Sequence, residues 1–172
     1  MRVSCRQKNL PTSLRCATTA ETVNEEYLED LHVGDRFGSD RIEVTAESIV
    51  AFARDFDPQP FHLDPAAAEQ SVFKELVASG WHTAAMSMRL FVTGELRPAG
   101  GSVGLGVDEL RWPRPVKPGD TLRLETEILD VRPSQSKPDR GVIRIRNVTT
   151  NQRGEIVQSF VASVLVRRRL SD

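Results

Sequence analysis

A carboxylic acid and an imidazole stand close together in residues 55–64, whose sequence is DFDPQPFHLD. The pair is Asp57 and His62, and Pro58 and Pro60 lie between them. Proline fixes its own φ angle and disfavours helical geometry at the residue before it, which predicts a stiff, extended connection. A carboxylate and an imidazole held at a set separation could address opposite ends of one small group, such as a water molecule and the bond to which it adds.

Two helices are predicted around this segment. Residues 45–55 carry apolar side chains at helical spacing, and Thr45 is a good N-cap, so this helix should lead the chain directly to Asp57. Residues 79–92 form the second helix, with Ser79 as its cap. This second helix is apolar almost all round, which predicts that it is buried. A short helix over residues 66–70 lies between them.

The remaining segments have the alternation and the proline and glycine punctuation of strands. The predicted strands are residues 37–44, 103–112, 121–131, 141–149 and 155–168. The last of them is apolar on both faces in its middle, which indicates a central, covered position. One buried helix followed by long antiparallel strands predicts an α+β fold in which a curved sheet wraps around a central helix.

Composition excludes several classes of protein. The chain has 172 residues and a formal net charge of −1, so it is long enough for one domain with a core and has no strong field for nucleic acid. No apolar run is long enough to span a membrane. The only cysteines are Cys5 and Cys16, which makes a disulfide framework improbable and fits a reducing cytoplasm.

The amino-terminal segment differs from the rest of the chain. Residues 1–20 are basic, rich in Ser and Thr, and contain no acid and no hydrophobic period. We interpret residues 1–24 as a disordered tail or the product of an upstream start codon, with a transit-like segment as the alternative. Residues 25–172 then form the folded domain.

The segment 57–62, DPQPFH, resembles the hydratase motif of the MaoC-like dehydratases, a hot-dog-fold family that includes the (R)-specific enoyl-CoA hydratases. Asp57, Pro60 and His62 match the motif, whereas Gln59 stands where the family often has Asn and Phe56 where it often has Gly. Two further segments look like the start of the family's central helix (77–82, VASGWH) and its strand, proline turn and Pro-Gly-Asp step (108–120). The resemblance runs from about residue 27 to residue 168.

The resemblance implies a hydro-lyase that interconverts a trans-2-enoyl-CoA and an (R)-3-hydroxyacyl-CoA. Asp57 and His62 would be the catalytic acid and base, and the Gly80 N–H would stabilise the thioester oxygen. Gln59 and Ser79 would bind the substrate. So would Ala84, Met88 and Phe91, which are spaced i, i+4, i+7 and form one stripe of the central helix. CoA is part of the substrate, so no cofactor and no metal is implied. The family's two-fold dimer implies a homodimer or a dimer of dimers.

Other interpretations remain open. The alternative function is a non-catalytic acyl-thioester-binding or regulatory hot-dog protein, and a thioesterase would use the same fold with a different arrangement of residues. His62 and Asp64 could be read as a metal-ligand pair, but no Cys/His cluster accompanies them. We expect a satisfied core or pocket histidine at 82, a surface histidine at 32, a flexible loop at 100–106 that leads into a strand, and a solvated, strand-protecting chain end at 167–169.

Overall fold

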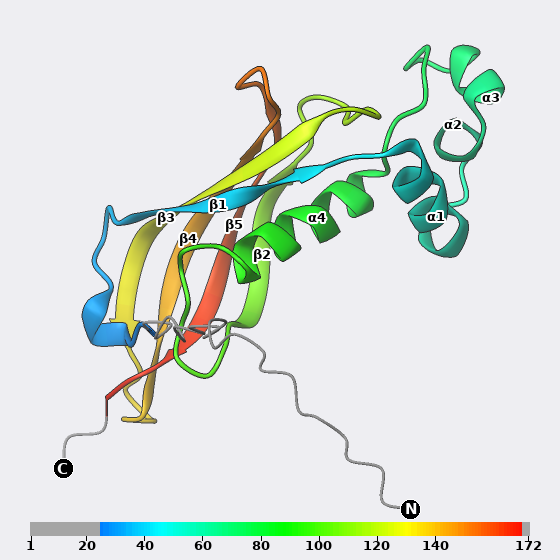
Figure 1. Ribbon diagram of the computed structural model, residues 1–172. Coiled ribbons are helices and arrows are strands. Elements are labelled where there is room, and N and C mark those ends of the chain that lie inside the picture. The colour runs from blue at the N-terminus through cyan, green and yellow to red at the C-terminus, as the bar shows by residue number, and fades with distance from the viewer. Residues whose placement is uncertain (1–24, 170–172) are drawn as a thin grey trace, which may run out of the picture.

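The computed structural model describes residues 25–169 and contains one five-stranded antiparallel sheet with a long helix across one face (Figure 1). The sheet curves around this helix, as the sequence pattern predicts. The strand order is β1-β3-β4-β5-β2. The strands are β1 (Arg36–Glu43), β2 (Val103–Arg111), β3 (Thr121–Pro133), β4 (Arg140–Thr150) and β5 (Ile156–Arg167).

All five strands were predicted from the sequence to within a few residues. In β4 the buried residues alternate with more exposed ones, and Ile143 and Ile145 are completely buried beneath the helix-covered face. β5 lies between β4 and β2, which confirms the central position predicted from its apolar middle. β1 and β2 are the edge strands.

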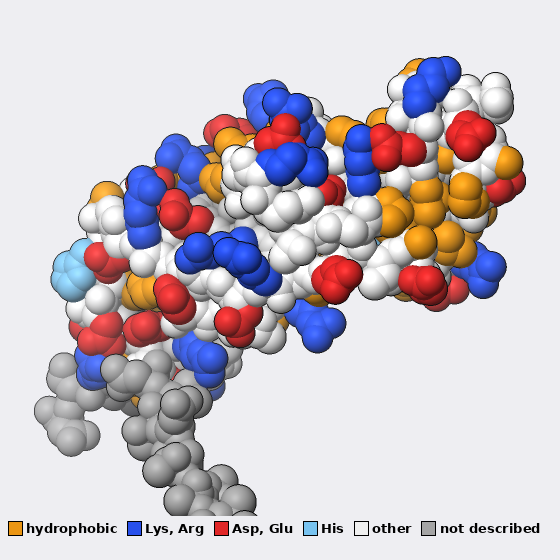
Figure 2. Space-filling model, turned by 45° about the horizontal axis from the view of Figure 1, so that its top comes forward, with side chains coloured by type: hydrophobic (Ala, Val, Ile, Leu, Met, Phe, Trp, Pro, Cys, Tyr) orange, Lys and Arg blue, Asp and Glu red, His pale blue; other side chains and the backbone are white. Residues whose placement is uncertain are grey.

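Most of the helices gather at one end of the sheet (Figure 1). α1 (Ala46–Phe56) begins at its predicted cap, Thr45, whose side chain accepts a hydrogen bond from the Ser48 N–H. It is followed by α2 (Pro60–Leu63) and α3 (Pro65–Glu69), while a short 3₁₀ helix (Leu28–Asp30) lies near the other end. Figure 2 shows hydrophobic side chains gathered over the end formed by α1 to α3.

The connection between Asp57 and His62 is extended only in its first half, which corrects the prediction of an extended segment throughout. Gln59 has extended geometry (φ −82°, ψ 143°), but Pro60 is the first residue of α2. A proline suits the first helical position because its fixed φ is helical and its missing N–H would have had no helical partner. The single turn of α2 is what points the His62 side chain inward.

The central helix, α4 (Gly80–Val92), is buried on one face only, contrary to the prediction from its composition. Met86, Leu90 and Phe91 pack into the core against the sheet. Trp81, Met88 and Val92 are about half exposed or more. One helix resting on one sheet covers a single stripe of its surface, so a second apolar stripe is left open in the isolated chain.

The predicted tail, residues 1–24, lies outside the described residues. Within residues 25–169 no helix has the length and apolar character needed to cross a bilayer.

Candidate active site

Asp57 and His62 converge at the amino-terminal end of α4. Asp57 ends α1, where its N–H donates to the Ala53 carbonyl, and His62 lies on the single turn of α2. The His62 Nε2 and the Asp57 Oδ2 are 3.5 Å apart. Both atoms can therefore contact one water molecule or one substrate atom at hydrogen-bonding distance.

The Asp57 carboxylate is held by two side-chain donors. The Ser79 hydroxyl donates to Oδ2 at 2.6 Å, and the Gln59 amide donates to Oδ1 at 2.8 Å. The hydrogen bond from Ser79 is the main reason why the pKa of Asp57 lies below its ordinary value, and it outweighs the opposing effect of partial burial; Gln59 and the nearby His62 lower it further. Asp57 is therefore a carboxylate at neutral pH.

The His62 ring is buried and oriented by the backbone. Its Nδ1 lies 2.7 Å from the Val77 carbonyl oxygen, and because a carbonyl can only accept, Nδ1 carries the hydrogen. Nε2, the other ring nitrogen, then points toward Asp57 with its lone pair in the neutral ring. Phe61 packs its ring edge-on against the imidazole, with ring centres 4.5 Å apart. This arrangement fixes both the tautomer and the direction of His62.

Gly80 places a backbone donor beside this pair. Ser79 caps α4 by accepting from the Trp81 N–H, and Gly80 is the first helical residue. Among residues 25–169, no group accepts a hydrogen bond from the Gly80 N–H. Free N–H groups and the helix dipole make this end of α4 favourable for negative charge. A Cβ at position 80 would lie only 2.9 Å from the Trp112 ring, so a larger residue here would displace that ring.

The side chains around Asp57 enclose a pocket of about 530 Å³. Five of the eight site residues predicted from the sequence line it: Asp57, Gln59, His62, Ser79 and Gly80. Sequence reasoning assigned no role to several other lining residues, namely Phe61, Phe73, Trp81, Trp112 and Arg114. Trp112 and Arg114 stand in the strand-and-proline segment that resembles the family, which was the one signal that could have singled them out.

The stripe Ala84, Met88 and Phe91 does not reach this pocket. Met88 and Phe91 line a separate apolar cavity of about 380 Å³ between α4 and strands β2, β4 and β5, while Ala84 is half-buried and lines neither cavity. A contact between this stripe and an acyl chain therefore stays a prediction.

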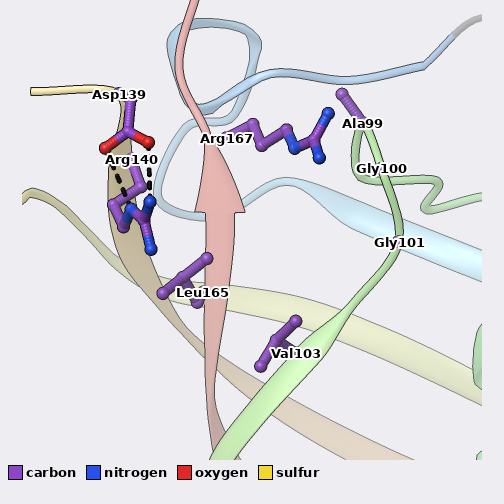
Figure 3. Close-up of a pocket in the computed structure, with 8 residues that line it drawn as sticks. All are labelled: Ala99, Gly100, Gly101, Val103, Asp139, Arg140, Leu165 and Arg167. Atoms are coloured by element: carbon purple, nitrogen blue, oxygen red, sulfur yellow. Dashed lines mark hydrogen bonds and ion pairs between the residues drawn. The ribbon is translucent and has the colours of Figure 1, made fainter.

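A third cavity lies at the far end of the sheet, where β5 ends (Figure 3). The Arg167 side chain extends toward Gly100, and a Cβ at Gly100 would lie 2.7 Å from the guanidinium carbon. Asp139 binds the neighbouring Arg140 through both carboxylate oxygens, at 2.9 and 2.6 Å. The glycine-rich segment leads into a strand, as predicted, but β2 already begins at Val103, so residues 103–106 of the predicted loop belong to the strand. None of these residues lines the pocket of Asp57 and His62.

The three histidines have different environments. His32 is on the surface, as predicted, with a side chain that is 74% exposed. His82 is buried and stacked on Phe52, with ring centres 4.7 Å apart, but its Nδ1 has no hydrogen-bond partner among the described residues, so the prediction of a satisfied histidine is wrong. Phe52 offers a ring face and no acceptor. Burial lowers the pKa of His82, which keeps it neutral.

A curved antiparallel sheet around one helix, with an acid and a histidine at the start of that helix, defines a hot-dog protein of the dehydratase type. The chain belongs to the MaoC-like family, since the model of the MaoC like domain matches residues 31–151.

Three relatives illustrate the range of the similarity. A MaoC-like dehydratase from Rhodospirillum rubrum is 55% identical, with a TM-score of 0.81 over 85% of this chain and 99% of that one. The R-hydratase PhaJ1 of Pseudomonas aeruginosa is 29% identical, with a TM-score of 0.66 over 85% and 92% of the two chains. Mesaconyl-CoA hydratase of Cereibacter sphaeroides is 45% identical over 65 residues, which are 38% of this chain and 19% of that enzyme.

Proposed function

We propose that this protein is a hydratase that interconverts a trans-2-enoyl-CoA and the corresponding (R)-3-hydroxyacyl-CoA. The observation that carries the proposal is the 3.5 Å approach of Asp57 Oδ2 and His62 Nε2 at the start of α4. The similarity to PhaJ1, an R-hydratase, supports both the reaction class and its stereochemistry.

The water molecule would bind between the acid and the histidine. When the His62 ring is neutral, Asp57 Oδ2 and His62 Nε2 are both acceptors, and one water can donate a hydrogen to each. Asp57 is a weak base because its pKa is lowered, so its role is to orient the water and to stabilise a positive charge on His62. His62 Nε2 is then the group that takes the proton.

The addition needs only one proton carrier. As the water oxygen bonds to Cβ of the enoyl group, one O–H bond breaks and the proton passes to His62 Nε2. The electrons of the C=C bond move toward the thioester oxygen, and the resulting enolate takes a proton at Cα from the His62 imidazolium. Both hydrogens of the water end in the product, and His62 is neutral again. This reaction needs no redox cofactor or metal.

The Gly80 N–H would stabilise the enolate oxygen. It lacks an acceptor within residues 25–169 and lies at the positive end of the α4 dipole. A fixed donor of this kind is worth about 2.7–4 kcal/mol in enzymes that form an oxyanion.

Loss of absorbance of crotonyl-CoA at its enone band tests the proposal directly. We expect Asp57→Asn and His62→Ala each to lower kcat at least about a hundredfold, the usual scale for a positioned acid or base. Asp64→Asn is the matched control, because Asp64 only caps α3 and asparagine caps equally well. Near-normal turnover in both Asp57→Asn and His62→Ala, or no turnover by the wild-type protein, would leave the non-catalytic acyl-thioester-binding function.

A further inference from the structure

The indole of Trp112 forms the wall of the pocket that lies against Gly80. Trp112 directly follows β2 and lines the pocket, and it is 40% exposed. Its Cδ2 and Cε2 atoms would lie 2.9 Å from a Cβ on residue 80, so the ring packs against the glycine itself. The indole therefore packs so closely on the first turn of α4 that a side chain at position 80 would displace it.

This wall is fixed in place from the opposite side. The Trp112 Nε1–H donates a 2.9 Å hydrogen bond to Gln158 Oε1, and Gln158 is completely buried on β5. The Gln158 Nε2 has no hydrogen-bond partner among residues 25–169, although leaving a buried donor unpaired is unfavourable. Among these residues, the hydrogen bond from Trp112 is therefore the one hydrogen bond that the Gln158 side chain makes.

Two neighbours restrict the indole further. Pro113 disfavours helical geometry at Trp112 and so keeps its backbone extended. The ring of Trp81 meets that of Trp112 edge to face, with centres 5.5 Å apart and planes at 74°. Trp112 is therefore a rigid wall, whereas Trp81, which is 60% exposed, lies at the mouth of the pocket.

The position of the wall relative to a substrate follows from the proposed function, on which this inference rests. If the Gly80 N–H binds the thioester oxygen, the carbonyl carbon lies next to Gly80, and the Trp112 ring, which packs on Gly80, lies beside the atoms bonded to that carbon, namely the sulfur and the first acyl carbon, C2. With C2 rather than the sulfur on the side of the ring, a substituent on C2 would enter space that the ring occupies. Carbons further along the acyl chain are farther from the ring.

We propose that Trp112 is a specificity-determining residue that selects acyl groups without a branch at C2. A single methyl group is enough for such selection, because one methylene too many in a tight apolar pocket changes kcat/KM by about 10- to 200-fold.

The kinetic test compares crotonyl-CoA with its 2-methyl derivative, tiglyl-CoA. The wild-type protein should prefer crotonyl-CoA, and Trp112→Leu should raise the tiglyl-to-crotonyl ratio of kcat/KM at least about tenfold. Phe73→Leu removes another aromatic ring of the pocket, one that pairs with Phe61 and, among the described residues, not with Trp112; it should change that ratio less than about twofold, within the error of such mutational comparisons. An equal preference in the wild type, or an unchanged ratio in Trp112→Leu, overturns the proposal.

A binding test separates this proposal from the proposed function. Butyryl-CoA and isobutyryl-CoA are saturated isomers that differ only in the branch at C2, and calorimetric titration measures their affinities without turnover. Preference for butyryl-CoA that is lost in Trp112→Leu supports the role of Trp112 even if no thioester is hydrated. Failure to bind either isomer overturns both proposals.

A second variant covers the case in which Trp112→Leu does not fold. Gln158→Met keeps the indole but removes its anchor, and it should raise the relative affinity for isobutyryl-CoA. If Gln158→Met folds and prefers butyryl-CoA over isobutyryl-CoA as strongly as the wild type does, the anchored Trp112 ring does not determine this preference and the proposal fails.

Discussion

The Ser79 hydroxyl contacts both the acid and the central helix. Its oxygen donates to Asp57 Oδ2 at 2.6 Å and accepts from the Trp81 N–H at 3.2 Å. The residue that begins α4 is therefore also the residue that holds the carboxylate in place. The geometry of the site and the start of the helix are coupled through one side chain.

Ser79→Ala should reduce stability in a pH-dependent way. Loss of the cap should lower the free energy of unfolding by about 0.5–2 kcal/mol at neutral pH. Because the folded pKa of Asp57 is lowered, its ionisation contributes stability that is present above its unfolded pKa of about 3.9 and is lost as the pH falls through the folded pKa. The hydrogen bond from Ser79 is the largest cause of the lowered pKa, so the deficit of the variant should be larger at pH 6 than near pH 3.

Urea unfolding at several pH values measures this effect. Ser79→Thr keeps a hydroxyl in the same place and should restore most of the lost stability. A deficit in Ser79→Ala that is the same at every pH would mean that Ser79 acts only as a helix cap.

His82→Phe should flatten the stability of the protein between pH 7.5 and pH 5. Burial lowers the folded pKa of His82 below its ordinary value of 6.5. The unfolded chain then binds the proton first, so stability is lost as the pH falls from about 6.5 toward the folded pKa. Phenylalanine preserves the stacking on Phe52 and removes the titrating group. His32→Asn, a change on the surface, serves as the control, and parallel curves for wild type and His82→Phe would contradict the prediction.

The free edge of β2 should pair with a second copy of the chain. Val103, Leu105 and Val107 are each more than half exposed in the first half of this edge strand, and its charged residues, Asp108, Glu109 and Arg111, lie in the second half. An exposed apolar edge invites strand pairing, and a two-fold axis closes the assembly. Light scattering should give at least twice the 19.2 kDa mass of one chain, as a dimer or a dimer of dimers.

A charge on this edge tests where the copies meet. Val107→Lys should shift the protein toward monomer, because pairing would bury the added charge. Val33→Lys places the same change on an exposed turn away from β2 and should leave the mass unaltered. A monomeric wild type at micromolar concentration would contradict the prediction.

Substitutions in the α4 stripe should separate packing from acyl-chain contact. Phe91 is 5% exposed, so Phe91→Ala should cost about 3–5 kcal/mol in stability. Met88 is 49% exposed, so Met88→Ala should change stability by only about 0.5 kcal/mol. If this stripe contacts the acyl chain, Met88→Ala should improve kcat/KM for longer linear enoyl-CoAs relative to crotonyl-CoA. An unchanged chain-length profile would end that assignment and leave the catalytic proposal intact.

Local pattern in the sequence determined most of the fold. Thr45 and Ser79 mark the starts of α1 and α4 because a capping side chain acts on the N–H groups two or three residues further on. The strands follow from side-chain alternation and from proline and glycine punctuation, which are also local signals. The pair Asp57 and His62 could be chosen for the same reason, since both residues lie in one short segment.

Contacts between distant segments were decided only by the tertiary structure. The sequence does not place Ser79 on the Asp57 carboxylate or Trp112 on Gly80, because these pairs are 22 and 32 positions apart and meet only when α1, α4 and β2 pack together. It also predicted a fully buried α4, because composition describes how apolar a helix is and not how much of its surface a single sheet can cover. The sequence thus identified the acid–histidine pair, and packing determined how the pair is held and which side chains line its pocket.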